Sequence, residues 1–200
     1  MRVRDLTVVG GETGIAIYGS EEVVLDDVTV VGARVDAIAA RQSSVAIRDC
    51  TIRGLAPTHT QPIDISFSST LAASVVEECD IRGGAEGIAT QMAHVEVRDN
   101  VVRGTTLRGI SLNEMSMGVV EDNFVRDALG IGILCMDYSV CDIEENRIVG
   151  TRPDPASEIT SRAGYAIVSH YGSTARLRDN ELRGNAAAAA SFIDARVFHR

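Results

Sequence analysis

One short pattern recurs eight times along the chain and constrains its fold more than any other feature. The pattern reads apolar, any, acidic, turn residue, any, apolar, any and usually Gly, and its best-formed copy runs from Val97 to Gly104. Successive turn residues are 22, 22, 29, 21, 23, 23 and 34 positions apart, and in order they are Leu6, Val28, Cys50, Cys79, Asn100, Asn123, Asn146 and Asn180. A period in this range predicts a solenoid, in which each repeat buries its apolar face only against its neighbours.

Each repeat alternates apolar and polar residues with the period of a β-strand. Val95, Val97 and Val102 would face one way, while Glu96 and Arg98 would face the other. The pattern allows three short strands per coil: one before the turn residue, one after it, and a third beyond a variable loop. The third, here called the Gly-Ile strand, begins as Gly14-Ile15, Gly87-Ile88, Gly109-Ile110 and Gly132-Ile133. We therefore predict one all-β domain over residues 1–200.

Three-stranded coils of this length, with Asn at the tight turn, resemble the right-handed parallel β-helix of the pectate-lyase-like superfamily over roughly residues 2–185. The resemblance implies a single-domain right-handed parallel β-helix of about eight three-stranded coils. Asn tolerates the left-handed conformation of a sharp turn, and its amide can bond to the Asn of adjacent coils. We expect such a ladder at Asn100, Asn123, Asn146 and Asn180, with apolar stacking at the four earlier turns.

Two charged columns follow from the same register. Carboxylates would stack just before the turn, at Asp5, Asp27, Asp49, Glu78, Asp99, Asp122, Glu145 and Asp179. Arginines collect three residues after it, at Arg53, Arg82, Arg103, Arg126 and Arg183. We expect the arginines to offset the repulsion among the carboxylates across the turn, as a structural charge ladder; an ion-binding stripe is the functional alternative.

Composition excludes several classes of partner. Apolar residues make up 45% of the chain and aromatic residues only 4%, which suits a narrow core lined by sheets. The net charge of −9 argues against binding nucleic acid or an anionic membrane surface, since both need a basic patch. The chain has no apolar run near 18 residues and no signal segment at its start, so no membrane partner is expected.

The four cysteines are not spaced as a metal knuckle. Cys50 and Cys79 occupy the same position on adjacent coils, about 5 Å apart, so a disulfide is allowed but stacked buried thiols are favoured. Cys135 and Cys141 are expected to be free as well. Free thiols favour a reducing compartment such as the cytoplasm, although the localisation stays open.

Two long insertions border the Gly-Ile strand, at Leu55 to Gln61 and at Thr151 to Ala163. Inserted loops of a solenoid gather on one face, which is often the binding face. In the resembled enzymes the sugar chain lies along this same face. We therefore expect a poly- or oligosaccharide partner between the two loops.

Alternation assigns the outward residues of the Gly-Ile strand. They are Ala16 and Tyr18, Ala39 and Arg41, Asp64 and Ser66, Ala89 and Gln91, Ser111 and Asn113, Leu134 and Met136, Val168 and His170. The first of each pair is mostly small, which predicts an open, shallow floor, and the second is mostly polar and suits sugar hydroxyls. A solvated sheet face with no ligand would show polar residues too.

The candidate catalytic residues are Asp64, Asp137 and His170. His170 beside Tyr171 could act as a general base next to a phenol, while Asp64 could equally form a simple ion pair with Arg41. Asp137 lies one coil from Glu114, near the roughly 5–5.5 Å of a retaining glycosidase pair, a spacing that turn carboxylates also reach by chance. The candidate substrate-binding residues are Arg41, Gln91, Asn113, Glu114, Tyr171, Arg152 and Arg162. Arg41, Arg108, Arg152 and Arg162 could supply a local positive field for an acidic sugar.

Catalytic motifs of the resembled families are incomplete. Of the polygalacturonase motifs only Asp26-Asp27 is present, on another strand, and the alginate epimerase motif is half present as Asp154-Pro155. The carboxylates are too scattered for a pectate-lyase calcium cluster, so no metal or cofactor is expected, with Ca²⁺ left open. Activity is undecided between polysaccharide lyase, glycoside hydrolase and epimerase.

The alternative function is a non-catalytic structural or assembly module of a larger surface or fibre protein. The few aromatic residues favour it, because sugar sites stack rings on Tyr or Trp.

The two ends carry expectations of their own. The first coil starts without a capping element, which predicts end-to-end self-association or contact with a neighbouring part of a parent chain. Ala186 to Ala190 favour a helix that would plug the other end, and residues 186–200 could equally form an extra coil.

Overall fold

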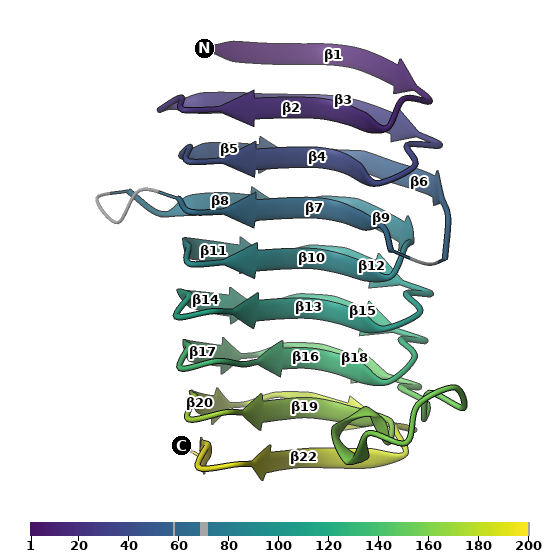
Figure 1. Cartoon of the computed structure of the whole chain (residues 1–200), viewed down its shortest axis with the longest axis vertical. Coiled ribbons are helices and arrows are strands. Elements are labelled where there is room, and N and C mark those ends of the chain that lie inside the picture. The colour runs from purple at the N-terminus through teal and green to yellow at the C-terminus, as the bar shows by residue number, and fades with distance from the viewer. Residues whose placement is uncertain (58, 69–71, 200) are drawn as a thin grey trace.

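The computed structural model describes residues 1–57, 59–68 and 72–199, which form one parallel β-helix of stacked coils (Figure 1). Each coil contributes its Gly-Ile strand to an eight-stranded parallel sheet on one side of the helix. Its strands are β2 (Thr13–Tyr18), β4 (Asp36–Arg41), β7 (Gln61–Ser66), β10 (Glu86–Gln91), β13 (Arg108–Asn113), β16 (Ile131–Cys135), β19 (Tyr165–His170) and β22 (Ala187–Phe192). The predicted fold class is confirmed.

The other sides of the helix form one fifteen-stranded sheet. The strands before the tight turn are β1 (Arg2–Val9), β3 (Val23–Val31), β5 (Val45–Arg48), β8 (Ser74–Glu77), β11 (His94–Arg98), β14 (Met117–Glu121), β17 (Val140–Glu144), β20 (Thr174–Arg178) and β23 (Arg196–His199). Those after it are β6 (Thr51–Leu55), β9 (Asp80–Gly83), β12 (Val101–Arg103), β15 (Phe124–Arg126), β18 (Arg147–Val149) and β21 (Glu181–Arg183). In the first two coils β1 and β3 run unbroken through the turn, with Leu6 paired to Val28, so the three-stranded coil begins only with β5.

The core is a stack of aliphatic side chains inside the coils. Val95, Val97, Val102, Ile110 and Leu112 are fully buried, as their alternation predicts. The Gly before the core Ile also faces inward: a Cβ on Gly109 would lie 2.5 Å from the carbonyl oxygen of Gly132 in the next coil. Close approach of adjacent backbones therefore requires a very small residue there.

The Asn ladder is present at the predicted turns. Asn100 Nδ2 donates to Asn123 Oδ1 at 2.9 Å, and Asn123 Nδ2 donates to Asn146 Oδ1 at 3.0 Å. The left-handed conformation was expected at these Asn residues, and that expectation is wrong. The preceding acidic residue adopts it instead, with φ between +50° and +56° at Asp5, Asp27, Asp49, Glu78, Asp99, Asp122, Glu145 and Asp179. That residue makes the bend, which leaves the Asn amide free to point along the column.

The arginines after the turn do not offset the turn carboxylates, contrary to expectation. Arg82 and Arg103 instead bind Asp80, at 2.7 and 2.6 Å. Residues i and i+2 share a face of a strand, so Asp80 meets Arg82 beside it and Arg103 on the next coil. The carboxylates before the turn therefore still repel one another. The charge of Asp49, for example, raises the pKa of Glu78 on the next coil.

The cysteines divide into two pairs. The thiols of Cys50 and Cys79 are buried and stacked, as predicted, and the Cys50 amide points at Cys79 Sγ from 3.4 Å. Cys135 and Cys141 were expected to be free but form a disulfide, because a tight turn brings their Cα atoms to 6.2 Å. Of the four cysteines, only Cys50 and Cys79 then remain as free thiols that would favour a reducing compartment.

Beyond β21 the chain continues the helix as an extra coil. Ala187–Phe192 forms β22, paired in parallel with β19, and β23 pairs with β20. The alternative of a helical plug is wrong, since pairing with the exposed edge of β19 overrides the helix propensity of alanine. End-to-end self-association stays a prediction. Among the described residues, no helix has the length and hydropathy needed to span a membrane.

Candidate functional site

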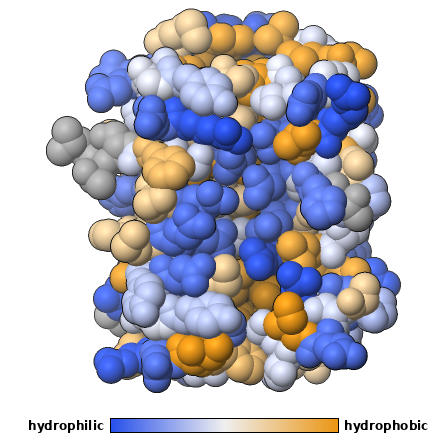
Figure 2. Space-filling model, viewed as in Figure 1, coloured by the Kyte–Doolittle hydropathy of each residue, from blue (hydrophilic) through white to orange (hydrophobic). Residues whose placement is uncertain are grey.

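Strand pairing aligns the outer side chains of the eight-stranded sheet in three rows along the helix axis. The start row holds Asp36, Gln61, Glu86, Arg108, Ile131 and Tyr165. The middle row holds Ala39, Asp64, Ala89, Ser111, Leu134 and Val168, and the end row holds Arg41, Ser66, Gln91, Asn113, His170 and Phe192. In Figure 2 hydrophilic residues predominate over the middle of the stack, and hydrophobic ones reach the surface lower down, toward β22.

The middle row is a buried floor and not the open, shallow one expected. Asp64 is only 4% exposed, and Ser111, Leu134 and Val168 are buried as well. The flanking rows and the loop side chains rise above it, because they carry larger residues than the floor does. A ligand could therefore contact the middle row only where a cavity opens between the flanking side chains.

Asp64 and two neighbours form an acidic cluster in the N-terminal half of the face. Arg41 Nε lies 3.7 Å from Asp64 Oδ2, and Arg41 Nη2 lies 3.8 Å from Asp36 Oδ2. Burial raises the pKa of Asp64 to about 6, and the charge of Asp36 adds to the effect. Burial raises the pKa of Asp36 too. The predicted pairing of Asp64 with Arg41 is confirmed, and Asp36 completes a site in which a carboxyl group can gain or lose a proton near neutral pH.

A cavity of about 350 Å³, here called the first cavity, opens beside this cluster. It is lined by Val35, Asp36, Arg41, His59, Thr60, Gln61, Ala85, Glu86 and Leu107. His59 and Thr60 come from the first long loop, so this loop forms a wall as predicted. Only some of the residues that lengthen this coil to 29 lie there. The rest lies in residues 67–73, between β7 and β8, of which 69–71 are outside the described residues.

Glu86 connects the first cavity with the next part of the face. It accepts a hydrogen bond from Ser111 Oγ at 2.7 Å and pairs with Arg108 Nη1 at 3.1 Å. Asn113, on the same strand as Arg108, donates to Ser111 Oγ at 3.2 Å. Among the described residues, seven side-chain atoms are buried without a hydrogen-bond partner, and three of them belong to this face: Asp64 Oδ1, Asn113 Oδ1 and Arg108 Nε. Such atoms are uncommon in folded proteins, and a water molecule or a ligand can bond to them after a small shift of the side chains that cover them.

A second cavity, of about 200 Å³, lies between β16, β19 and the other long loop. It is lined by Arg108, Ile131, Leu134, Met136, Ile159, Ser161, Arg162, His170 and Tyr171. The loop is held by bridges from Leu129 to Arg152 and from Pro153 to Ala163, and it contains the short 3₁₀ helix η1 (Thr160–Arg162). Both long loops thus border the face, as the sequence predicts.

His170 sits in an aromatic group at the C-terminal end of the face. Its ring centroid lies 4.0 Å from that of Tyr171 and 5.7 Å from that of Phe192, and both contacts are edge-to-face. Burial lowers the pKa of His170, although the charge of Asp137 acts in the opposite direction. His170 was expected to be exposed but is half-buried, because Phe192 belongs to the extra coil and packs against it.

We expect Phe192→Ala to raise the pKa of His170, since the imidazolium would regain water. The midpoint of the His170 ring signals in an NMR titration measures this. Phe198→Ala, on β23 of the other sheet, is the matched control and should leave the midpoint unchanged. An unaltered midpoint in Phe192→Ala would show that Phe192 does not desolvate the imidazole.

The remaining candidates occupy the rim. Glu114 and Asp137 lie in turns of adjacent coils, where the Met115 amide donates to the Asp137 carbonyl at 2.7 Å. Gln91 is half-buried beside Asn113, Tyr171 overhangs the second cavity, and Arg152 is exposed. The candidates therefore share one face, but the three predicted catalytic residues do not meet: Asp64 lies beside the first cavity, whereas His170 lines the second and Asp137 acts on it from nearby.

The expected positive field is largely absent, which corrects the prediction for an acidic sugar. Arg41 faces Asp36 and Asp64, and Arg108 pairs with Glu86. Arg162 Nη1 lies 3.6 Å from Asp154. Parallel stacking brings carboxylates of one coil beside arginines of the next, and alternation within a strand does not reveal such pairs.

Sequence reasoning missed Asp36, Glu86, Ile131 and Phe192 as parts of the site. The first three stand directly before the small residue that precedes the core Ile, as in Glu86-Gly87-Ile88. This position in the repeat is the sequence signal that could have identified them as residues of the outer face. Phe192 was missed because its segment also read as a helix.

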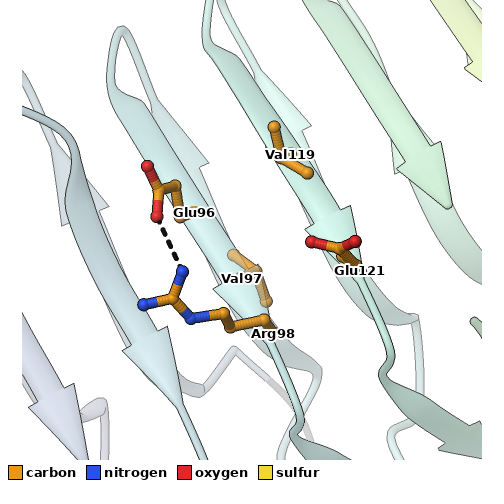
Figure 3. A pocket seen from close by; sticks show the side chains of 5 residues that line it. All are labelled: Glu96, Val97, Arg98, Val119 and Glu121. Carbon is orange, nitrogen blue, oxygen red and sulfur yellow. Dashed lines mark hydrogen bonds and ion pairs between the residues drawn. The ribbon is translucent and has the colours of Figure 1, made fainter. Parts of the chain in front are cut away.

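A third hollow, of about 250 Å³, lies on the fifteen-stranded sheet and is lined by Glu96, Val97, Arg98, Val119 and Glu121 (Figure 3). Arg98 binds Glu96 at 3.0 Å and Glu77 at 2.7 Å. The cation in this hollow is already paired, so we assign it a structural role. In residues 1–57, 59–68 and 72–199, no group of three or more His, Cys, Asp or Glu side chains is arranged to hold a metal ion.

Comparison with known proteins places the fold. Residues 13–197 match the Beta_helix family, described as a right handed beta helix region. None of the curated proteins compared with the chain matches it. Two solved structures are similar with a TM-score of 0.63, the A-modules of the Azotobacter vinelandii mannuronan C-5 epimerases AlgE4 and AlgE6, at 14% and 13% identity. The similarity covers 98% of this chain but 57% of each of those chains. The chain belongs to the right-handed β-helix family.

Proposed function

We propose that the protein binds a poly- or oligosaccharide along the outer face of the eight-stranded sheet. The observation that carries the proposal is the set of buried polar atoms without a partner among the described residues, above all Asp64 Oδ1 and Asn113 Oδ1. Leaving such atoms unpaired costs about 1–3 kcal/mol each, and ligand hydroxyls would recover it. The two cavities and their loop walls border the same face.

The solved neighbours support a carbohydrate ligand by analogy. Their names state that they are mannuronan epimerases, so this fold can present a polysaccharide to catalytic groups. At 14% and 13% identity the similarity establishes the fold alone, and the ligand of this chain is inferred from its own face.

Within this proposal the residues take distinct roles. Asp64 is the group most suited to proton transfer, since it is buried beside Arg41 and Asp36. His170, near Asp137, is the corresponding group in the second cavity. Arg41, Gln91 and Asn113 would bond ligand hydroxyls, and the rim residues Glu114, Tyr171, Arg152 and Arg162 would contact the ends of the ligand. A lyase, hydrolase or epimerase reaction is compatible with this set, and Ca²⁺ stays an open ligand.

We expect Arg41→Ala to weaken oligosaccharide binding about tenfold, the value of one charge-assisted hydrogen bond. A glycan array identifies the ligand, and calorimetry then compares the variants. Arg48→Ala is the matched control, since the Arg48 side chain is 44% exposed against 45% for Arg41 but lies on the other sheet, paired with Glu77. His170→Ala should also weaken binding. If Arg41→Ala binds like the parent protein, the face is wrongly assigned.

A structural or assembly role is the second candidate, and one surface feature favours it. The turns after the Gly-Ile strands carry a line of exposed hydrophobic residues, here called the apolar edge: Phe67, Met115, Tyr138, Tyr171 and Ile193. Such a line can dock a protein neighbour. Under the second candidate, a Met115→Ser, Tyr138→Ser double variant would alter association in sedimentation while leaving glycan binding intact.

A further inference from the structure

The second cavity differs from the rest of the face in its lining. Ile131 and Leu134 form a buried floor, Met136 lies beside them, and Ile159 closes the loop side. At about 200 Å³ the cavity is smaller than the roughly 300–1,000 Å³ of a typical small-molecule site. It can accommodate one group of a larger ligand.

The charges around this cavity are already compensated. Arg108 pairs with Glu86, and both side chains are largely buried. Arg162 pairs with Asp154, and burial lowers the pKa of His170, which favours the uncharged imidazole. A carboxylate entering the cavity would lose water without gaining an unpaired cation, which is unfavourable.

The shape of the lining distinguishes between uncharged groups. A bare sugar ring packs best on the flat face of an aromatic side chain. His170 and Tyr171 also line this cavity, but their rings pack edge-to-face against each other, and the floor is made of branched aliphatic residues with a flexible Met beside them. Alkyl groups pack well in such surroundings. One polar group can also take part: Arg108 lines the cavity, and its Nε, which is buried without an acceptor among the described residues, would face a ligand after a small shift of the side chain. A carbonyl oxygen would provide one.

We propose that the second cavity binds an uncharged acyl substituent of the carbohydrate, with the alkyl part on Ile131 and Leu134 and the carbonyl oxygen accepting from Arg108 Nε. The inference rests on the proposed function and narrows it to a polysaccharide whose sugars carry ester or amide acyl groups. It also gives the long loop 151–163 a role, since Ile159 supplies one wall of the acyl site.

Two small probes of similar size test the cavity directly. Methyl acetate and acetate ion are titrated at pH 7 into protein labelled at the Met methyl carbons, and the signals of Met136 and Met117 are followed by NMR. We expect a saturable shift of Met136 with methyl acetate, about tenfold weaker binding of acetate, and no saturable shift of Met117, which lies on the other sheet. Equal or tighter binding of acetate, or no saturable shift at Met136, overturns the proposal.

Two variants sharpen this result. Ile159→Asp alters an exposed loop residue, so folding is not at risk, and it should abolish the Met136 shift with methyl acetate. Glu86→Gln leaves Arg108 without its carboxylate and should bring acetate affinity up toward that of methyl acetate. If neither variant changes the titrations, the probes bind elsewhere and the proposal fails.

An array of polysaccharides in O-acetylated and alkali-deacetylated pairs then separates the two proposals. We expect the parent protein to prefer the acetylated member and Ile159→Asp to lose that preference. Equal binding of both members refutes the acyl site while leaving the proposed function intact. Binding of no polysaccharide at all refutes the proposed function itself.

Discussion

Asp64→Asn should stabilise the protein at pH 7 by up to about 3 kcal/mol, because it removes a carboxylate that the fold holds in an unfavourable place. Burial raises the pKa of Asp64 from 3.8 to about 6, and each pKa unit corresponds to about 1.4 kcal/mol. The folded state binds the proton more tightly than the unfolded state does. The contribution of Asp64 to the free energy of unfolding is therefore fully present below about pH 4 and is lost as the pH rises through about 6. An Asn at this position cannot ionise, so the variant does not lose it.

Urea titrations of both proteins between pH 3.5 and 7.5 measure this effect. The two free energies of unfolding should nearly coincide at pH 3.5, diverge between about pH 4 and pH 6, and differ by a constant amount above that. Arg41→Ala provides the internal check, since the charge of Arg41 lowers the pKa of Asp64 and its loss should steepen the pH dependence. A constant difference across the range, or a less stable Asp64→Asn at pH 7, would show that Asp64 ionises normally. If Asp64→Asn stabilises the protein, then Asp64 lowers stability in the parent chain, as residues retained for function often do.

Asn123→Ala should lower the free energy of unfolding by about 3 kcal/mol, because several buried groups lose their partners together. The side-chain Nδ2 of Asn123 donates to Val97 O, Glu121 O and Asn146 Oδ1. Its Oδ1 accepts from the backbone N–H and the side-chain Nδ2 of Asn100. Asn180, last in the column, donates to Ile143 O and accepts twice from Asn146.

Asn180→Ala is thus the matched control and should cost about 1 kcal/mol, with fewer and less buried partners. Urea titrations at one pH measure both variants. Equal losses would mean that the ladder contributes locally at each turn and that position in the column is irrelevant.

The repeat predicts the fold because its signals are local and agree with one another. Spacing, strand alternation and the Asn residues at the turns all require stacked coils, and the structure places Asn100, Asn123, Asn146 and Asn180 in hydrogen-bonded contact. The bend was assigned to the wrong residue by one position, since Asn and Asp both tolerate positive φ.

The site was less predictable because it depends on contacts between coils. Strict alternation fails at the Gly-Ile strand, where Gly109 and Ile110 both face the interior, so the residue before the Gly comes to lie on the outer face. Asp36 and Glu86 were missed for this reason. The pairing of Arg108 with Glu86, and the contact of His170 with Phe192, join residues 22 positions apart in sequence and follow only from the register.

Within the proposed site, the Glu86–Arg108 pair would make the two cavities thermodynamically dependent on each other. Burial and the charge of Asp36 are the larger causes of the raised pKa of Asp64, Glu86 adds to them, and Glu86 also neutralises Arg108. A group in the second cavity that draws on Arg108 leaves the charge of Glu86 less compensated, and Asp64 then holds its proton more tightly. Linkage is reciprocal, so protonating Asp64 must favour occupancy of the second cavity by the same factor. The proposed acyl site would thereby couple the proton affinity of Asp64 to ligand recognition in the second cavity.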